Sequence, residues 1–250
     1  MIKKASLCLT ILIFALLSAC KNNETVDMNI VIKHTANGNT VVFDSFFYTN
    51  EFGNKYIVTE IQYFLSNIEL CDNKGQWTAF NSDKHIFYID TDIPESQTIK
   101  SNGLKVGQYN RIRFTFGLNE TDNVTGLFTD APEANMFWPE PLGGGYHYMK
   151  LNGKWQDDNG QLLPMNVHLG IGQNSTFTEF YQNYFQVELP INVNIIEDVE
   201  AEIQLNMVID NWFRTPNLIN LAEYGSGIMQ NQEAQELYKA NGNDVFKILP

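Results

Sequence analysis

The sequence predicts an all-β protein, an antiparallel β-sandwich of about nine or ten strands with one or two short C-terminal helices. Several segments alternate apolar and polar residues with the period of two that half-buried strands show, most clearly residues 28–34, 109–117 and 201–209. Turn signals such as Asn37-Gly38 and Asp157-Asp158-Asn159-Gly160 separate the segments. Helix signals occur only near the end of the chain.

The N-terminal segment is expected to direct the chain out of the cytoplasm rather than to fold. Lys3 and Lys4 precede a short apolar run, and Leu17-Ser18-Ala19-Cys20 matches the bacterial lipoprotein processing pattern. The apolar run is too short to remain as a membrane-spanning helix. We therefore expect a signal peptide at residues 1–19, a lipidated tether at 20–27 that begins with acylated Cys20, and one domain at 28–250. The predicted location is the cell envelope, at the periplasmic or surface face of the outer membrane.

Charge and cysteine content exclude several kinds of partner. The formal net charge is −13, and it becomes −15 when residues 1–19 leave with Lys3 and Lys4. Such an acidic chain is not suited to bind nucleic acid or an anionic bilayer by charge, so the lipid would be its only attachment to the membrane. Once Cys8 leaves and Cys20 is acylated, Cys71 stands alone, and no intrachain disulfide is expected.

The expected elements follow one another in a simple order. Residues 118–145 read as a long loop rich in proline and glycine, and such loops are often functional. One helix is expected from Thr215-Pro216 to about Tyr224, and a second over residues 232–240, capped by Asn231 and ended by Asn241-Gly242. Further strands are expected at residues 40–43, 55–71, 77–80, 85–90, 165–170 and 185–195, with residues 143–154 leading into the strand at 165–170.

Two histidines flank the predicted hairpin turn. If its loop contains an even number of residues, His147 and His168 share one face of the hairpin and can reach a common point. A three-residue loop would instead place them on opposite faces. His34 lies on the apolar face of strand 28–34, and Met149 follows His147 by two residues. Neutral imidazoles suit copper and zinc, and a thioether favours Cu(I), so these four residues are the candidate metal ligands.

Other kinds of site have weaker support. Asp90-x-Asp92 and residues 119–123 supply hard oxygen atoms, but neither matches a known calcium loop. The sequence has no nucleophile elbow and no glycine-rich loop that opens a helix, so an enzyme is not expected. A hydrolase that uses paired acids remains a lesser option. The main alternative is an interaction protein that holds a glycan or peptide on the aromatic residues of 46–52 and 136–148, with histidines that are merely structural.

An ordered series of motifs resembles the MbnP-like family, named for the methanobactin-associated periplasmic copper-binding protein and related to copper-repressible surface proteins of methanotrophs. The C-terminal residues 234–246 are similar to lipoprotein members of the Bacteroidetes type. The carrying motifs are IQYFLSNIEL at 61–70, YNRIRFTFGL at 109–118, MFW at 136–138, GGGYHYMKLNGK at 143–154 and VHLG at 167–170.

The resemblance implies a β-sandwich that binds copper outside the cytoplasm. Family members use histidines together with a tryptophan oxidised to kynurenine, in one case by a partner di-haem, peroxidase-like enzyme. Carried over by motif, His147 and His168 are the first candidates and His34 the third. Trp138 is the candidate oxidised aromatic residue, although it is not immediately beside His147 in the sequence. The expected role is metal capture or delivery.

Overall fold

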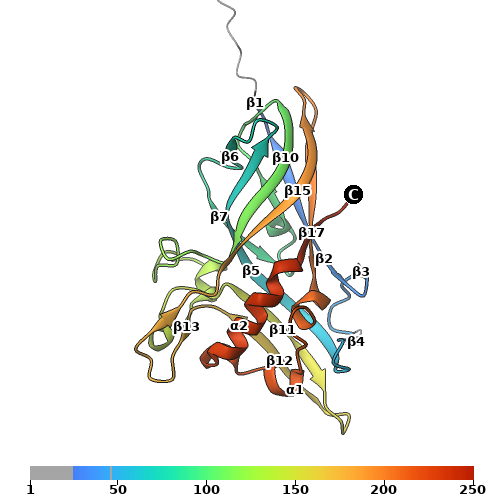
Figure 1. Cartoon of the computed structure of the whole chain (residues 1–250), viewed down its shortest axis with the longest axis vertical. Helices are drawn as coiled ribbons and strands as arrows, with labels where there is room; N and C mark the ends of the chain where they lie inside the picture. Colours follow the sequence, from blue (N-terminus) through green and yellow to red (C-terminus); the bar gives the residue numbers. More distant parts are fainter. Residues whose placement is uncertain (1–24, 46) are drawn as a thin grey trace, which may run out of the picture.

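The computed structural model describes residues 25–45 and 47–250. The predicted signal peptide at 1–19, Cys20 and the first part of the tether lie outside these residues. Within them, two sheets stack to enclose one apolar core, with helical segments at one end (Figure 1). The prediction of an all-β sandwich is therefore confirmed. Several strands have only two or three residues, too few to give an alternating pattern, so the structure contains more strands than the sequence suggests.

The larger sheet contains eight strands in the described part of the chain. Its order is β12-β11-β5-β10-β15, and β4, β6 and β7 also pair with β5. The bounds are Tyr48–Thr49 for β4, Lys55–Asp72 for β5, Trp77–Ala79 for β6, Ile86–Asp90 for β7, Gly107–Phe116 for β10, Met149–Gln156 for β11, Leu162–Leu169 for β12 and Phe185–Ile195 for β15.

The smaller sheet has the order β17-β16-β2-β3, with β8 also paired to β2. Its bounds are Met28–Ala36 for β2, Asn39–Thr40 for β3, Thr98–Lys100 for β8, Ala201–Val208 for β16 and Phe246–Ile248 for β17. In contrast to the antiparallel prediction, β2 and β16 are parallel. Parallel neighbours require a long crossover, and here the whole larger sheet lies between them in the chain. Two short pairs complete the strands: β1 (Thr25–Val26) with β9 (Leu104–Lys105), and β13 (Gly172–Gln173) with β14 (Phe180–Tyr181).

The helices lie near the C-terminus, as predicted. Helix α2 spans Gln232–Asn241, and the side chain of Asn231 caps it by accepting from the Ala234 amide. The predicted start of the first helix at Thr215-Pro216 is wrong, because α1 spans only Leu221–Tyr224 and Asn220 caps it. No helix in the described residues has the length and apolarity needed to cross a bilayer. Short 3-10 turns occur at Pro94–Gln97, Glu133–Met136, Glu140–Leu142, Ile209–Phe213, Ile228–Gln230 and Gly242–Asp244.

Strand β5 changes its neighbour at Phe64. Before this residue β5 pairs with β11, and after it with β10. The Phe64 amide donates to the carbonyl of Tyr148 (3.1 Å), and the Phe64 carbonyl accepts from the amide of Gly117 (2.9 Å). Because both groups of one residue point to the same edge of a strand, β11 and β10 occupy that edge in succession and diverge at Phe64. Figure 1 shows β10 and β11 running apart along β5. The residues between Gly117 and Tyr148 leave and re-enter the sheet at this fork.

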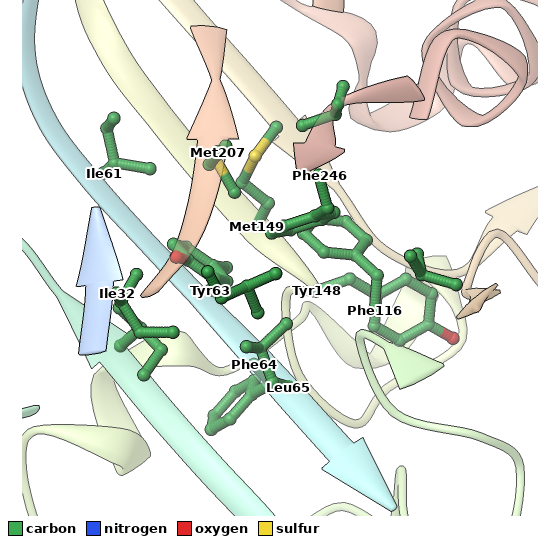
Figure 2. Packing of buried hydrophobic residues seen from close by; sticks show 14 of the residues in the cluster. Ile32, Ile61, Tyr63, Phe64, Leu65, Phe116, Tyr148, Met149, Met207 and Phe246 are labelled. Atoms are coloured by element: carbon green, nitrogen blue, oxygen red, sulfur yellow. The ribbon is translucent and has the colours of Figure 1, made fainter. Parts of the chain in front are cut away.

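The core lies between the two sheets, next to the fork. Figure 2 shows aromatic rings of the larger sheet, among them Tyr63 and Phe116, meeting Met207 and Phe246 of the smaller sheet. Met149 lies in the same cluster and is fully buried. Met149 and Leu151 both lie on the inward face of β11. Burial in the core therefore determines which residues of this strand point inward.

Gly117 at the fork is expected to tolerate no side chain. Its φ is +87°, and an added Cβ would lie 2.7 Å from the Tyr148 ring. We expect Gly117→Ala to lower the free energy of unfolding by about 2–5 kcal/mol, from left-handed strain plus overpacking. Gly75→Ala is the matched control, because Gly75 has a φ of +82° but open space around it. It should cost only about 1–2 kcal/mol in urea unfolding. Equal losses in the two variants would contradict the packing argument.

Candidate metal centre

Trp138 and His147 lie in the loop that joins β10 to β11. The loop folds back on itself, since Phe137 and Tyr146 form an isolated bridge. The Trp138 amide donates to the carbonyl of Gly145 (2.8 Å), and the His147 amide donates to the carbonyl of Met136 (2.6 Å). Two residues that are separated in the sequence are thereby brought side by side, which resolves the apparent distance of Trp138 from His147.

The three glycines of the loop make this fold-back possible. Gly143, Gly144 and Gly145 have φ values of +112°, +67° and +78°, which residues with side chains rarely adopt. A Cβ at Gly145 would also overlap the amide of Asn123. Asn123 uses that amide oxygen to accept from the Tyr146 backbone (2.8 Å). The three glycines therefore allow the backbone before His147 to pack closely against Asn123.

The hairpin register differs from the one that the histidine prediction needed. Lys150 pairs with His168, and the Asp157 amide bonds to the carbonyl of Gln161, which leaves a loop of three residues. In a regular hairpin this register would put His147 and His168 on opposite faces. They nevertheless meet, because regular strand geometry begins only at Met149 and His147 belongs to the irregular loop before it. The convergence holds, but the reasoning from an even-numbered loop is wrong.

Three rings are in contact at the site. The centroids of His147 and His168 are 5.1 Å apart at an interplanar angle of 84°. The centroid of Trp138 lies 4.7 Å from that of His147 at 75°. Trp138 is fully buried, and its ring lies directly over Gly170, where an added Cβ would come within 2.6 Å of the indole. The pair of imidazoles thus has one wall made of an aromatic ring.

Each imidazole uses one nitrogen in a hydrogen bond. His147 Nδ1 is 2.9 Å from the carbonyl oxygen of Met136. A carbonyl oxygen only accepts, so Nδ1 carries the hydrogen and Nε2 holds the lone pair of the neutral ring. His168 Nε2 is 2.9 Å from Oδ1 of Asn152. These two bonds occupy Nδ1 of His147 and Nε2 of His168, so Nε2 of His147 and Nδ1 of His168 are the candidate ligand atoms; the Phe137 backbone also interacts with the His147 imidazole.

Both imidazoles are held neutral. Burial is the main cause that lowers the pKa of His147 to about 3, and the nearby His168 and Lys150 add to it. Burial, with the charge of Lys150, lowers the pKa of His168 to about 4. Metal ions bind the neutral imidazole, so neither ring must lose a proton at neutral pH before it can act as a ligand.

Helix α2 fixes the strand that carries His168. The side chain of Gln235 is fully buried, and its amide donates to the His168 carbonyl (2.8 Å). Its oxygen accepts from the Gly170 amide at 3.2 Å. One side chain thus holds the backbone on both sides of Leu169. Sequence reasoning missed this contact because a polar residue in a surface-like helix carries no sign of its distant partner.

His34 and Met149 lie in the interior, apart from the histidine pair. The Nε2 atom of His34 is 3.1 Å from the hydroxyl of Tyr63, and burial lowers the pKa of His34 to about 4. The three histidines do not form a group with ligand spacing in the described residues. Met149 lies on the inward face of β11, whereas its neighbour Lys150 pairs with His168 on the other face. The structure therefore brings together two of the four candidate ligands.

One acidic group does have ligand spacing within the described part of the chain. Oxygen atoms of Glu60, Asp90 and Asp92 lie within 4.8 Å of one another. The carboxylate of Asp90 already accepts from the Tyr88 hydroxyl (2.6 Å), from Gln62 (3.0 Å) and from the Asp92 amide (2.8 Å). Its lone pairs are thus largely used within the protein, as expected for turn-forming acids.

The described aromatic residues of the two candidate loops divide between exposed and buried positions. Phe52 and Phe137 are each about half exposed, while Tyr48, Trp138 and Tyr146 are buried. Three cavities, of about 510, 620 and 490 Å³, open at the surface, and none is lined by an aromatic side chain. None of these three cavities therefore provides an aromatic platform for a glycan or peptide.

The fold and the site define an all-β protein of two stacked sheets with a pair of imidazoles, one buried and one half-buried, beside a tryptophan. The sequence profile of the MbnP family matches residues 25–230, so the chain belongs to the MbnP family. The solved structure of MbnP from Methylosinus trichosporium is similar, with a TM-score of 0.60 and 12% identity over 90% of this chain and 98% of that one. This identity supports the fold alone. No curated protein matches the chain.

We expect the two imidazoles of the copper-free protein to resist protonation. Their pKa values of about 3 and about 4 lie below the ordinary value near 6.5. At pH values between the folded and the ordinary pKa, the unfolded chain therefore binds more protons than the folded chain. The free energy of unfolding should therefore fall as the pH drops from about 6.5 towards about 4. Histidine NMR titration together with urea unfolding at each pH measures both effects. Resonances of His147 and His168 that titrate near 6.5 would contradict the prediction.

Proposed function

We propose that the chain is an extracytoplasmic copper-binding protein that acts in metal capture or delivery rather than in catalysis. The observation that carries the proposal is the contact between the neutral rings of His147 and His168, each oriented by a hydrogen bond at one nitrogen. His147 would bind through Nε2 and His168 through Nδ1. The hydrogen bonds at the opposite nitrogens would orient the rings, as is usual for histidines that bind metal.

Copper in the Cu(I) state suits this donor set better than zinc. Structural zinc sites almost always have four protein ligands, and catalytic ones have three. No third His, Cys, Asp or Glu joins the pair with ligand spacing in the described residues. Cu(I) is stable with two nitrogen donors, and family membership adds an expectation of copper that comes from relatives. His34 and Met149 are not part of the proposed ligand set.

Trp138 is proposed as the residue that oxidation would convert to kynurenine. Its ring contacts His147. Oxidative ring opening by the partner enzyme and hydrolytic loss of the formyl carbon would turn Nε1, which now donates to the Leu142 carbonyl at 3.1 Å, into an aromatic amine. By family resemblance, a partner di-haem enzyme would perform the oxidation. The cell-envelope location and the lipid on Cys20 are likewise proposed, on the processing pattern at residues 17–20.

The first experiment compares copper binding in the purified protein and in a His147→Ala/His168→Ala variant. We expect about one Cu(I) per chain in the wild-type protein, measured by metal analysis and by competition with a chromophoric chelator. The double variant should lose it, because both donor nitrogens are removed. His34→Phe is the control, since His34 faces Tyr63 in the core, and it should keep the copper. Equal copper binding by wild type and double variant would refute the site.

Lys150 is expected to discriminate against divalent ions. It pairs with His168 across the hairpin, and its Nζ donates to the Asn135 carbonyl at 2.7 Å, next to Met136. Repulsion from the ammonium doubles when the ion is divalent. Lys150→Gln should therefore raise the affinity for Cu(II) more than that for Cu(I), seen as a lower reduction potential of the bound copper. Lys154→Gln, an exposed neighbour on the same strand, is the matched control. An unchanged potential in Lys150→Gln would contradict this role.

A further inference from the structure

A chain of two hydrogen bonds leads from His168 into the larger sheet. It crosses three adjacent strands, with His168 on β12, Asn152 on β11 and Glu60 on β5. His168 Nε2 lies 2.9 Å from Asn152 Oδ1, and Asn152 Nδ2 lies 3.0 Å from Glu60 Oε2. Asn152 and Glu60 are direct partners in the strand register, so the sheet itself holds them opposite one another.

The carboxylate gives this chain a single direction. A carboxylate only accepts hydrogen bonds, so Asn152 must turn its NH₂ group to Glu60 and its oxygen to His168. That oxygen also only accepts, so His168 Nε2 must carry the hydrogen. In the neutral ring the lone pair then lies on Nδ1. The Glu60 carboxylate thus orients the Asn152 amide, and the amide oxygen in turn determines which nitrogen of His168 carries the lone pair.

We propose that Asn152 and Glu60 are positioning residues of the copper site, which fix His168 in the Nε2–H tautomer so that Nδ1 is the metal ligand. The inference rests on the proposed copper-binding function. The other ligand needs no such device, because a backbone carbonyl fixes the tautomer of His147. His168 depends on side chains instead, and its tautomer can therefore be changed by mutation without moving the backbone.

Glu60→Gln is the decisive substitution. It keeps the shape of the side chain but no longer fixes which partner donates in the hydrogen bond to Asn152. A glutamine amide can accept from Asn152 or donate to it. When it donates, Asn152 turns over and presents NH₂ to His168, which selects the Nδ1–H tautomer that cannot bind metal through Nδ1.

Two further variants complete the set. Asn152→Leu removes the acceptor for His168 altogether. The double variant Glu60→Gln/Asn152→Asp restores the acceptor, because the carboxylate introduced at position 152 can only accept, both from His168 and from the amide introduced at position 60. The direction of the hydrogen bonds at His168 is then the same as in the wild-type protein.

The test measures two quantities in the purified protein. Imidazole ¹⁵N NMR of the copper-free form reports the tautomer of His168, and chelator competition reports the Cu(I) affinity. In Glu60→Gln and Asn152→Leu we expect a larger Nδ1–H population and about 10- to 100-fold weaker Cu(I) binding. The double variant should recover the wild-type tautomer and most of the affinity. Glu188→Gln, which removes a charge elsewhere on the same sheet, should change neither quantity.

The two readouts separate the possible failures. An unchanged His168 tautomer in both single variants would overturn the positioning role, and so would a changed tautomer with unchanged Cu(I) affinity. Loss of affinity without recovery in the double variant would also overturn it, since that pattern indicates general damage to the sheet. Failure of the wild-type protein to bind Cu(I) would instead overturn the proposed function, whatever the tautomer data show.

Discussion

The exchange of partners at Phe64 is the constraint on which the rest of the structure depends. A single strand, β5, supports two hairpin-like units along one edge, β11 with β12 and β10 with β15. Where the two units separate, the amide of Phe64 bonds to Tyr148, which precedes β11, and its carbonyl bonds to Gly117, which follows β10. The connecting loop has to begin and end at this point, which places His147 at the edge of a rigid sheet. The site thus combines a loop residue, His147, with a strand residue, His168, and a common core holds both.

Burial and hydrogen bonding act together on the histidine pair. An imidazole removed from water favours its neutral form, and its remaining polar hydrogen then needs an acceptor. The carbonyl of Met136 and the amide oxygen of Asn152 meet that need, one for each ring. The outcome is a pair of rings with defined orientation and defined lone pairs. The same pressure acts on His34, where the hydroxyl of Tyr63 satisfies the ring inside the core. A buried histidine is therefore not in itself a sign of a metal ligand, and what distinguishes His147 and His168 is that their rings are in contact.

Sequence patterns predicted the fold class, most long strands and the cap of α2, whereas the proximity of His147 to His168 rested on a loop length that the structure does not have. The first three features follow from local chemistry such as alternation, turn residues and capping side chains. The parallel contact of β2 with β16 and the role of Gln235 could not be predicted, because both join segments far apart in the chain. The register of the hairpin could not be predicted either, since Asp157-Asp158-Asn159-Gly160 fits loops of more than one length. His34 is a candidate by residue type and by family resemblance, and alternation cannot say which sheet a strand joins.

The two hydrogen bonds of Gln235 to the backbone of His168 and Gly170 link the site to a segment much later in the chain. Gln235 lies 67 residues beyond His168, so α2 is synthesised after both histidines. Strand β12 is an edge strand, and without the helix its outer backbone groups at His168 and Gly170 would face water. Alignment of the histidine pair is therefore coupled to the folding of α2, and a chain shortened by proteolysis within this helix would keep both histidines but lose the support that aligns one of them.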